Sequence, residues 1–175
     1  MLNKHGQLFL AVVIFFDTIV ISFSWLAAFY IHFKTSLGPS PRYATPEIEI
    51  YLLALIPVWI VFIFSTRIYG LYKPLRGKPI STELFKIIRV TSFSVIVLAA
   101  LTFFYREESF SRFVAVYFYA IVTTLMFTSH LLVRLMLAKA RALGFNIRHV
   151  LIVGSEELAQ SVAEKISLHS EYGFK

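Results

Sequence analysis

An aspartate lies inside the first long apolar stretch of the chain. A carboxylate at the depth of Asp17 is costly in a membrane helix, so it usually faces other helices or a polar cavity. We expect its partners at similar depth in later stretches, namely Arg89, His130 and Arg134. Two interpretations follow, a proton or lipid-phosphate site and a buried ion pair that fixes helix register. We favour the ion pair, because transporters usually place several such residues on facing helices.

Several basic residues lie near the ends of the apolar stretches. Arg89 and Arg134 have side chains long enough to reach a membrane interface. Arg76 and Lys78 lie in the connection between the second and third stretches. These cations either extend into the interfacial water or contact the phosphate of a phospholipid or a polyprenyl phosphate.

A turn near the end of the chain occupies the place of a dinucleotide-binding motif. Residues 150–153 are apolar and mostly β-branched, which predicts a buried parallel strand, and Gly154 and Ser155 lead into a predicted helix. In the dinucleotide motif a second glycine lets the backbone approach a pyrophosphate. Here that position is Glu156, followed by Glu157. Two carboxylates repel a phosphate, so we favour a structural unit without tight dinucleotide binding.

No pattern typical of a catalytic or metal site is found in the sequence. It contains no hydrolase triad, paired carboxylates or metal-ligand cluster, and it has no cysteine. We therefore predict no catalytic residue, no metal ligand and no cofactor in this chain. His32 lies near the end of the first stretch and has no expected role.

Four apolar stretches position these residues. The stretches cover residues 8–31, 50–68, 84–105 and 112–140. At about 1.5 Å per residue, each is long enough to cross a hydrocarbon core of roughly 30 Å. The composition agrees, because 58% of the residues are hydrophobic and only 15% are charged, whereas soluble domains have about a quarter charged. We predict a mainly α-helical integral membrane protein, with a four-helix transmembrane bundle over residues 1–143. Residues 144–175 are predicted to be the first βα unit of an incomplete Rossmann-like domain.

The placement of charge predicts the orientation of the chain. The formal net charge is +7, and basic residues gather at the amino end, around Arg76, and from Arg134 onward. Since positive residues stay on the cytoplasmic side, we expect both termini in the cytoplasm. The basic excess also attracts anionic lipids, and we expect no nucleic-acid partner.

Prolines, glycines and hydroxyl residues predict local features. Pro57 predicts a kink in the second helix. Gly70 is placed to end that helix as a C-cap. Ser81 or Thr82 is placed to cap the third helix, and Ser111 the fourth.

The order of several short motifs is that of one protein family. The motifs are Asp17, Tyr69-Gly70-Leu71-Tyr72 with Leu75-Arg76, Ser111-Arg112, and Asn146-Ile147-Arg148-His149-Val150-Leu151-Ile152-Val153-Gly154. With these, essentially the whole chain resembles the amino-terminal region of the large polyprenyl-phosphate hexose-1-phosphate transferases, such as undecaprenyl-phosphate glucose phosphotransferases. The resemblance implies four transmembrane helices, a Rossmann-like cytoplasmic domain and a carboxyl-terminal catalytic domain.

The resemblance also implies a reaction. Proteins of this family transfer a hexose-1-phosphate from a nucleotide sugar, here expected to be UDP-glucose, to undecaprenyl phosphate, which initiates exopolysaccharide, capsule or O-antigen synthesis at the bacterial inner membrane. The Mg²⁺-dependent Asp-Glu pair of their catalytic domain has no counterpart in this sequence, so we expect the 175-residue chain to be inactive alone. Its expected roles are anchoring and assembly, with membrane lipids, including undecaprenyl phosphate, and a second copy of the chain as partners.

Two alternatives remain. Membrane-bound nucleotide-sugar 4,6-dehydratases and epimerases have a similar four-helix lead and Rossmann-like module, followed by a second NAD-binding domain in place of the transferase domain. A stand-alone four-helix transport or assembly protein is the third interpretation.

Overall fold

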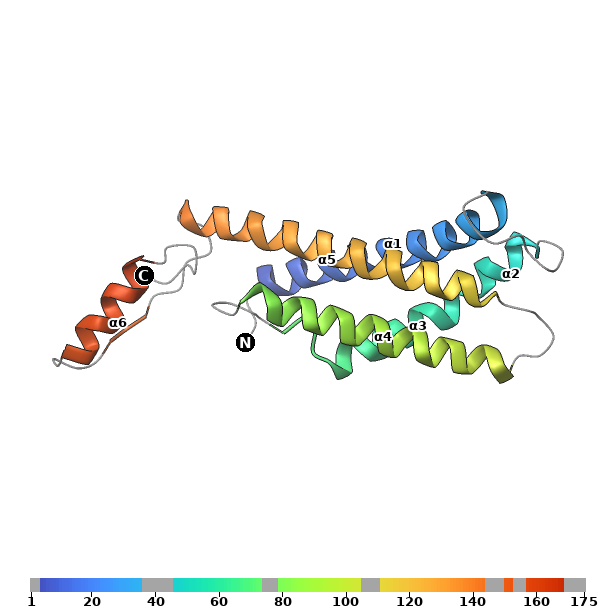
Figure 1. Ribbon diagram of the computed structural model, residues 1–175. Coiled ribbons are helices and arrows are strands. Elements are labelled where there is room, and N and C mark those ends of the chain that lie inside the picture. The colour runs from blue at the N-terminus through green and yellow to red at the C-terminus, as the bar shows by residue number, and fades with distance from the viewer. Residues whose placement is uncertain are drawn as a thin grey trace. The chain divides into compact units, whose positions relative to one another are not determined.

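Helices make up nearly all of the structure that is described. The computed structural model describes residues 4–35, 46–73, 79–104, 111–143, 150–152 and 157–168. The helices are α1 (Lys4–Lys34), α2 (Ile48–Leu53), α3 (Leu55–Ile68), α4 (Ile80–Phe104), α5 (Arg112–Ala142) and α6 (Glu157–Leu168) (Figure 1). They belong to two compact units, Met1–Pro74 with Ile80–Phe127, and Leu75–Pro79 with Thr128–Lys175.

Four helical segments in the described ranges are long and apolar enough to cross a membrane. They are Gln7–Lys34, Ile48–Ile68, Ile80–Thr102 and Arg112–Ala140. The four apolar helices expected from the sequence are therefore present, and their length and composition indicate membrane association.

The predicted βα unit is wrong. Residues 150–152 form no strand, and no strand occurs elsewhere in the described ranges, although the helix predicted to follow is present as α6. A strand is stable only when its backbone groups exchange hydrogen bonds with a neighbouring strand, and the described residues supply none. Gly154 and Ser155, the predicted turn, lie outside the described residues. Within the described residues the fold is helical, and no Rossmann-like unit is seen.

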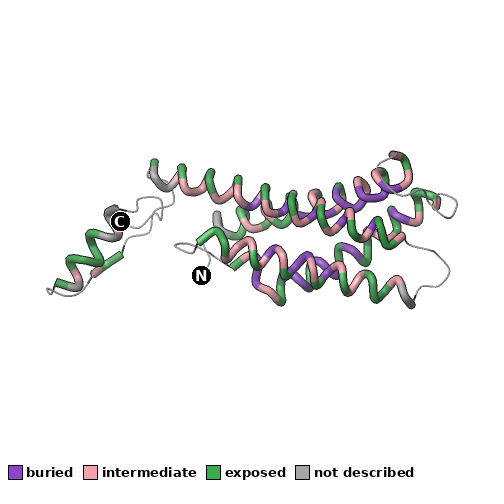
Figure 2. The backbone as a smooth tube through the Cα atoms, in the orientation of Figure 1, coloured by how far each residue is buried: buried purple, intermediate pink, exposed green. Residues whose placement is uncertain are grey.

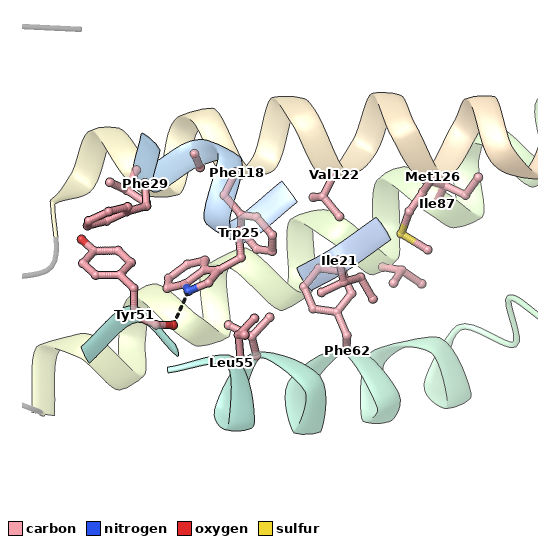
Figure 3. Close-up of a cluster of buried hydrophobic side chains, with 14 of the residues drawn as sticks. Ile21, Trp25, Phe29, Tyr51, Leu55, Phe62, Ile87, Phe118, Val122 and Met126 are labelled. Atoms are coloured by element: carbon pink, nitrogen blue, oxygen red, sulfur yellow. Dashed lines mark hydrogen bonds between the residues drawn. The ribbon is translucent and has the colours of Figure 1, made fainter. Parts of the chain in front are cut away.

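In the first unit, α1, α3, α4 and residues 112–127 of α5 bury one apolar core (Figures 2 and 3). On α5 the buried side chains recur at every fourth position: Val114, Phe118, Val122 and Met126. This spacing places them on one face of the helix. The ring of Phe118 meets the ring of Trp25 edge-on, with centroids 5.2 Å apart. The bundle is therefore held by interdigitated aromatic and aliphatic side chains.

The outward faces of the same helices are also apolar. Large side chains such as Phe16, Phe23 and Ile96 are exposed. Soluble monomers rarely expose contiguous apolar patches larger than a few hundred Å². Surfaces of this kind suit a hydrocarbon environment.

Pro57 interrupts the second span, as predicted. Helix α2 ends at Leu53 and α3 begins at Leu55, with Ala54 as the junction. A proline has no N–H, and its ring clashes with the carbonyl four residues earlier, which here is that of Leu53. The break between the two helices therefore lies next to the Leu53 carbonyl, to which Pro57 cannot donate a hydrogen bond.

Gly70 ends α3, as predicted. Its φ is +58°, a conformation that costs a residue with a Cβ roughly 1 kcal/mol or more. The N–H of Gly70 donates to the Arg67 carbonyl at 3.2 Å, and the N–H of Leu71 donates to the Thr66 carbonyl at 3.1 Å. These two bonds form a Schellman motif, and Leu71 is buried beneath the turn.

One of the two predicted helix caps differs from the structure. Helix α4 begins at Ile80, so Ser81 and Thr82 lie inside its first turn and do not precede it. Ser111 does occupy the position before α5, where its carbonyl accepts the Val114 N–H at 3.1 Å. Its side chain has another partner, described below.

Candidate functional site: polar contacts between apolar helices

A partly buried hydrogen bond joins α1 to the turn that follows α3. Asp17 is only 2% exposed, and its Oδ2 accepts a hydrogen bond from the Tyr72 hydroxyl at 2.9 Å. A buried carboxylate without hydrogen bonds is strongly unfavourable. A hydrogen bond to a charged group contributes about 1.5–3 kcal/mol, so this contact stabilises the placement of an acid among apolar helices.

Tyr72, the partner of Asp17 described above, is not among the partners predicted from the sequence. Arg89 is exposed and forms no ion pair within the described residues. His130 is buried, and both His130 and Arg134 belong to the second compact unit, so their pairing with Asp17 stays a prediction. Tyr72 was missed because it lies outside the apolar stretches. The one feature of the sequence that pointed to Tyr72 was its position two residues after Gly70, which ends the helix.

The Gly70 turn also contacts α4. The Lys86 Nζ donates to the Gly70 carbonyl at 2.7 Å, and the rings of Tyr69 and Phe93 pack edge-on with centroids 5.7 Å apart. Residues 69–72 therefore contact both α1 and α4. We refer to residues 67–73 and 80–93 of the first unit as the Gly70 end.

A second polar contact joins α1 to the start of α5. His32 is 4% exposed, and its Nε2 lies 2.8 Å from the Ser111 Oγ. Its ring stacks on that of Phe113 at a centroid distance of 5.7 Å. His32 therefore has a structural role that the sequence did not indicate. We refer to residues 29–35, 47–51 and 111–117 as the Ser111 end.

The indole of Trp25 forms a hydrogen bond close to the break in the second span. The Trp25 Nε1 donates to the Tyr51 carbonyl at 2.9 Å (Figure 3). Tyr51 lies in the last turn of α2, where carbonyl groups lack intrahelical partners. The helix end beside Pro57 thus provides an acceptor for a buried indole N–H.

Hydroxyl side chains connect helices deeper in the bundle. The Ser94 Oγ donates to the Ser65 Oγ at 2.8 Å, joining α4 to α3. The Thr123 Oγ1 donates to the Thr91 Oγ1 at 3.0 Å, joining α5 to α4. Hydrogen bonds of this kind contribute about 0.6 kcal/mol each on average between membrane helices, so they specify helix pairing more than they add stability.

These polar groups hold the helices of the chain together. Each contact described above joins two helices or a helix and a turn. A search of the described residues for three or more side chains able to hold a metal ion finds none. Four other predicted site residues, Arg76, Lys78, Gly154 and Ser155, lie outside the described residues.

The fold and these contacts define a helical protein with four candidate membrane spans. A family model described as a CoA-binding domain matches residues 67–174, more than half of the chain. The chain therefore belongs to this CoA-binding domain family, whose domain is found in sugar-transferase-related proteins. No curated protein and no solved structure matches the chain significantly.

The family description names coenzyme A, and the start of α6 does not fit its phosphates. A pyrophosphate is commonly held by backbone N–H groups at the start of a helix, where an anion is favoured. In α6 the first turn carries the exposed carboxylate of Glu157, which occupies that favourable field and repels a second anion. Much of the matched stretch consists of the apolar helices α4 and α5.

Substitution of Tyr72 by Phe should change how stability depends on pH. Burial, then the negative charge of Asp17 and the hydrogen bond to it, raise the pKa of Tyr72 in the folded state above its ordinary value of about 10. A raised folded-state pKa gives stability that is complete below the unfolded-state pKa and is lost as pH rises past it. In detergent, wild type should unfold at a higher temperature than Tyr72→Phe near neutral pH, and the difference should shrink above about pH 10.

The control for this series is Tyr30→Phe, which alters an exposed ring on α1. That variant should follow the wild-type pH profile. A Tyr72→Phe difference that stayed constant from neutral to strongly alkaline pH would contradict the assigned contact.

Removal of the Ser111 hydroxyl should destabilise the bundle because it leaves the buried His32 Nε2 without its partner. We expect Ser111→Ala to cost about 1–3 kcal/mol, whereas replacing both polar partners, as in His32→Phe with Ser111→Ala, should recover much of the loss. Thermal unfolding in detergent measures the loss in the single variant and the recovery in the double variant. Thr102→Ala is the control, since that hydroxyl bonds only within its own helix, to the Ala99 carbonyl. Additive losses in the double variant would argue against the contact.

Proposed function

We propose that this chain is the membrane-anchoring and assembly portion of a sugar-phosphate transferase of the bacterial inner membrane. The reaction proposed for the whole enzyme moves a hexose-1-phosphate from a nucleotide sugar, with UDP-glucose as the expected donor, to undecaprenyl phosphate. This step initiates exopolysaccharide, capsule or O-antigen synthesis.

The main support for this proposal is the position of the family match on the helices. The stretch matched to a domain of sugar-transferase-related proteins begins at the end of α3 and includes two complete candidate spans, α4 and α5. The Gly70 turn lies inside this stretch and contacts α1 through Tyr72 and Asp17. Within the first unit, the matched stretch therefore contacts the apolar helix α1.

The proposed role of the helices is mechanical. Exposed apolar faces hold the bundle in lipid, while the buried contacts at Asp17 and His32 keep its helices in register. We assign transfer chemistry, and the Mg²⁺ that the resemblance implies for it, to a catalytic domain outside these residues. No reaction step is assigned to a side chain of this chain.

The proposed orientation places both chain termini in the cytoplasm. It is supported by the greater number of cations at the Gly70 end, because positively charged residues flank membrane helices mainly on the cytoplasmic side. The Ser111 end is then extracytoplasmic. We also propose that the chain assembles with copies of itself.

A transfer assay tests the proposed reaction. Membranes from cells that express the complete gene product should move labelled glucose phosphate from UDP-glucose to undecaprenyl phosphate. Membranes that contain residues 1–175 alone should be inactive, because the predicted catalytic carboxylates are not among them. Conversion of the nucleotide sugar to a 4-keto product without any lipid-linked sugar would instead identify a dehydratase, and the proposal would fail.

A further inference from the structure

Charge is distributed unequally between the two ends of the first unit. Among the described residues, the Gly70 end has four cations and one carboxylate: Arg67, Lys73, Lys86 and Arg89, with Glu83. The Ser111 end has two of each: Lys34 and Arg112, with Glu47 and Glu49. Only the Gly70 end has a clear positive excess.

Three of these cations have no acidic partner within the described structure. Arg67, Lys73 and Arg89 are exposed, and no ion pair is found for any of the three in the described residues. The nearby buried acid, Asp17, accepts its hydrogen bond from Tyr72 and is itself 2% exposed. The three exposed cations are therefore available to an external anion.

The surroundings of these cations indicate the kind of anion. On α4, Phe85, Arg89 and Phe93 follow one another at four-residue spacing, which places them on one helix face. Both rings are exposed, Phe85 by 60% and Phe93 by 37%. On α3, Arg67 is followed by Ile68, which is 65% exposed. An exposed cation bordered by exposed apolar side chains matches a ligand with a charged head and a hydrocarbon tail.

We propose that the Gly70 end binds the headgroups of anionic phospholipids through Arg67, Lys73 and Arg89. A soluble anion would gain nothing from the adjacent Phe85 and Phe93 rings, whereas an acyl chain packs against them. A basic residue close to an anionic membrane surface contributes about 1 kcal/mol, which corresponds to a change in affinity of roughly fivefold. The inference rests on the proposed membrane insertion and adds a lipid preference to it.

Native mass spectrometry of the full chain in detergent tests this preference. Titration with phosphatidylglycerol and with phosphatidylcholine of identical acyl chains should show tighter binding of phosphatidylglycerol. Arg89→Gln should lower that preference about fivefold, and Lys73→Gln should lower it similarly. Both side chains are exposed, and unfolding temperatures of the variants confirm that they fold. The matched control is Arg112→Gln, an exposed arginine at the Ser111 end, which should retain the wild-type preference.

Three results would overturn the inference. The first is equal binding of the two lipids by wild type. The second is a loss in Arg112→Gln as large as that in Arg89→Gln. The third is displacement of phosphatidylglycerol by millimolar inorganic phosphate, which would identify a site for free anions.

Flotation separates failure of this inference from failure of the proposed function. The chain should float with phosphatidylcholine liposomes after alkaline carbonate extraction. A chain that floats but shows no lipid preference contradicts only the headgroup site, whereas a chain that is extracted contradicts the membrane anchor as well.

Discussion

The hydrogen bond between Asp17 and Tyr72 is the interaction on which the arrangement of the first unit depends. A carboxylate that is 2% exposed among apolar helices requires a donor, and the Tyr72 hydroxyl supplies one at 2.9 Å. Tyr72 reaches that position only because Gly70, at a φ of +58°, ends α3 in a tight turn. Lys86 then donates to the carbonyl of the same glycine. The turn that supplies the donor to Asp17 thus connects the end of α3 to both α1 and α4.

At the opposite end of the unit, the helices are joined by hydrogen bonds that involve no carboxylate. His32 and Ser111 join α1 to α5, and Trp25 donates to the carbonyl of Tyr51 in α2. That acceptor lies in the last turn of α2, next to the break that Pro57 imposes. Between the two ends lies the core of buried apolar side chains. Polar contacts at both ends and an apolar core between them give a bundle suited to anchoring.

Features set by local chemistry were predictable from the sequence. The apolar stretches follow from composition, Gly70 from the need for a positive φ, and the break from the missing N–H of Pro57. Contacts between residues distant in the sequence were not predictable, because helical periodicity indicates which face of a helix is buried but not which residue of another helix packs against it. His32 was missed for this reason, whereas Tyr72 was missed because it lies in a turn outside the apolar stretches. The strand over residues 150–153 was predicted wrongly from β-branched composition alone, since a strand also requires a pairing partner.

Single-cysteine labelling shows whether the helices anchor the protein with both termini in the cytoplasm. The native sequence has no cysteine, so each introduced thiol is unique. Arg112→Cys at the Ser111 end and Lys73→Cys at the Gly70 end both replace exposed side chains. In intact spheroplasts, a membrane-impermeant maleimide should label Arg112→Cys, and it should label Lys73→Cys only after permeabilisation. Equal labelling of both thiols in intact spheroplasts, or the reverse pattern, would contradict the account.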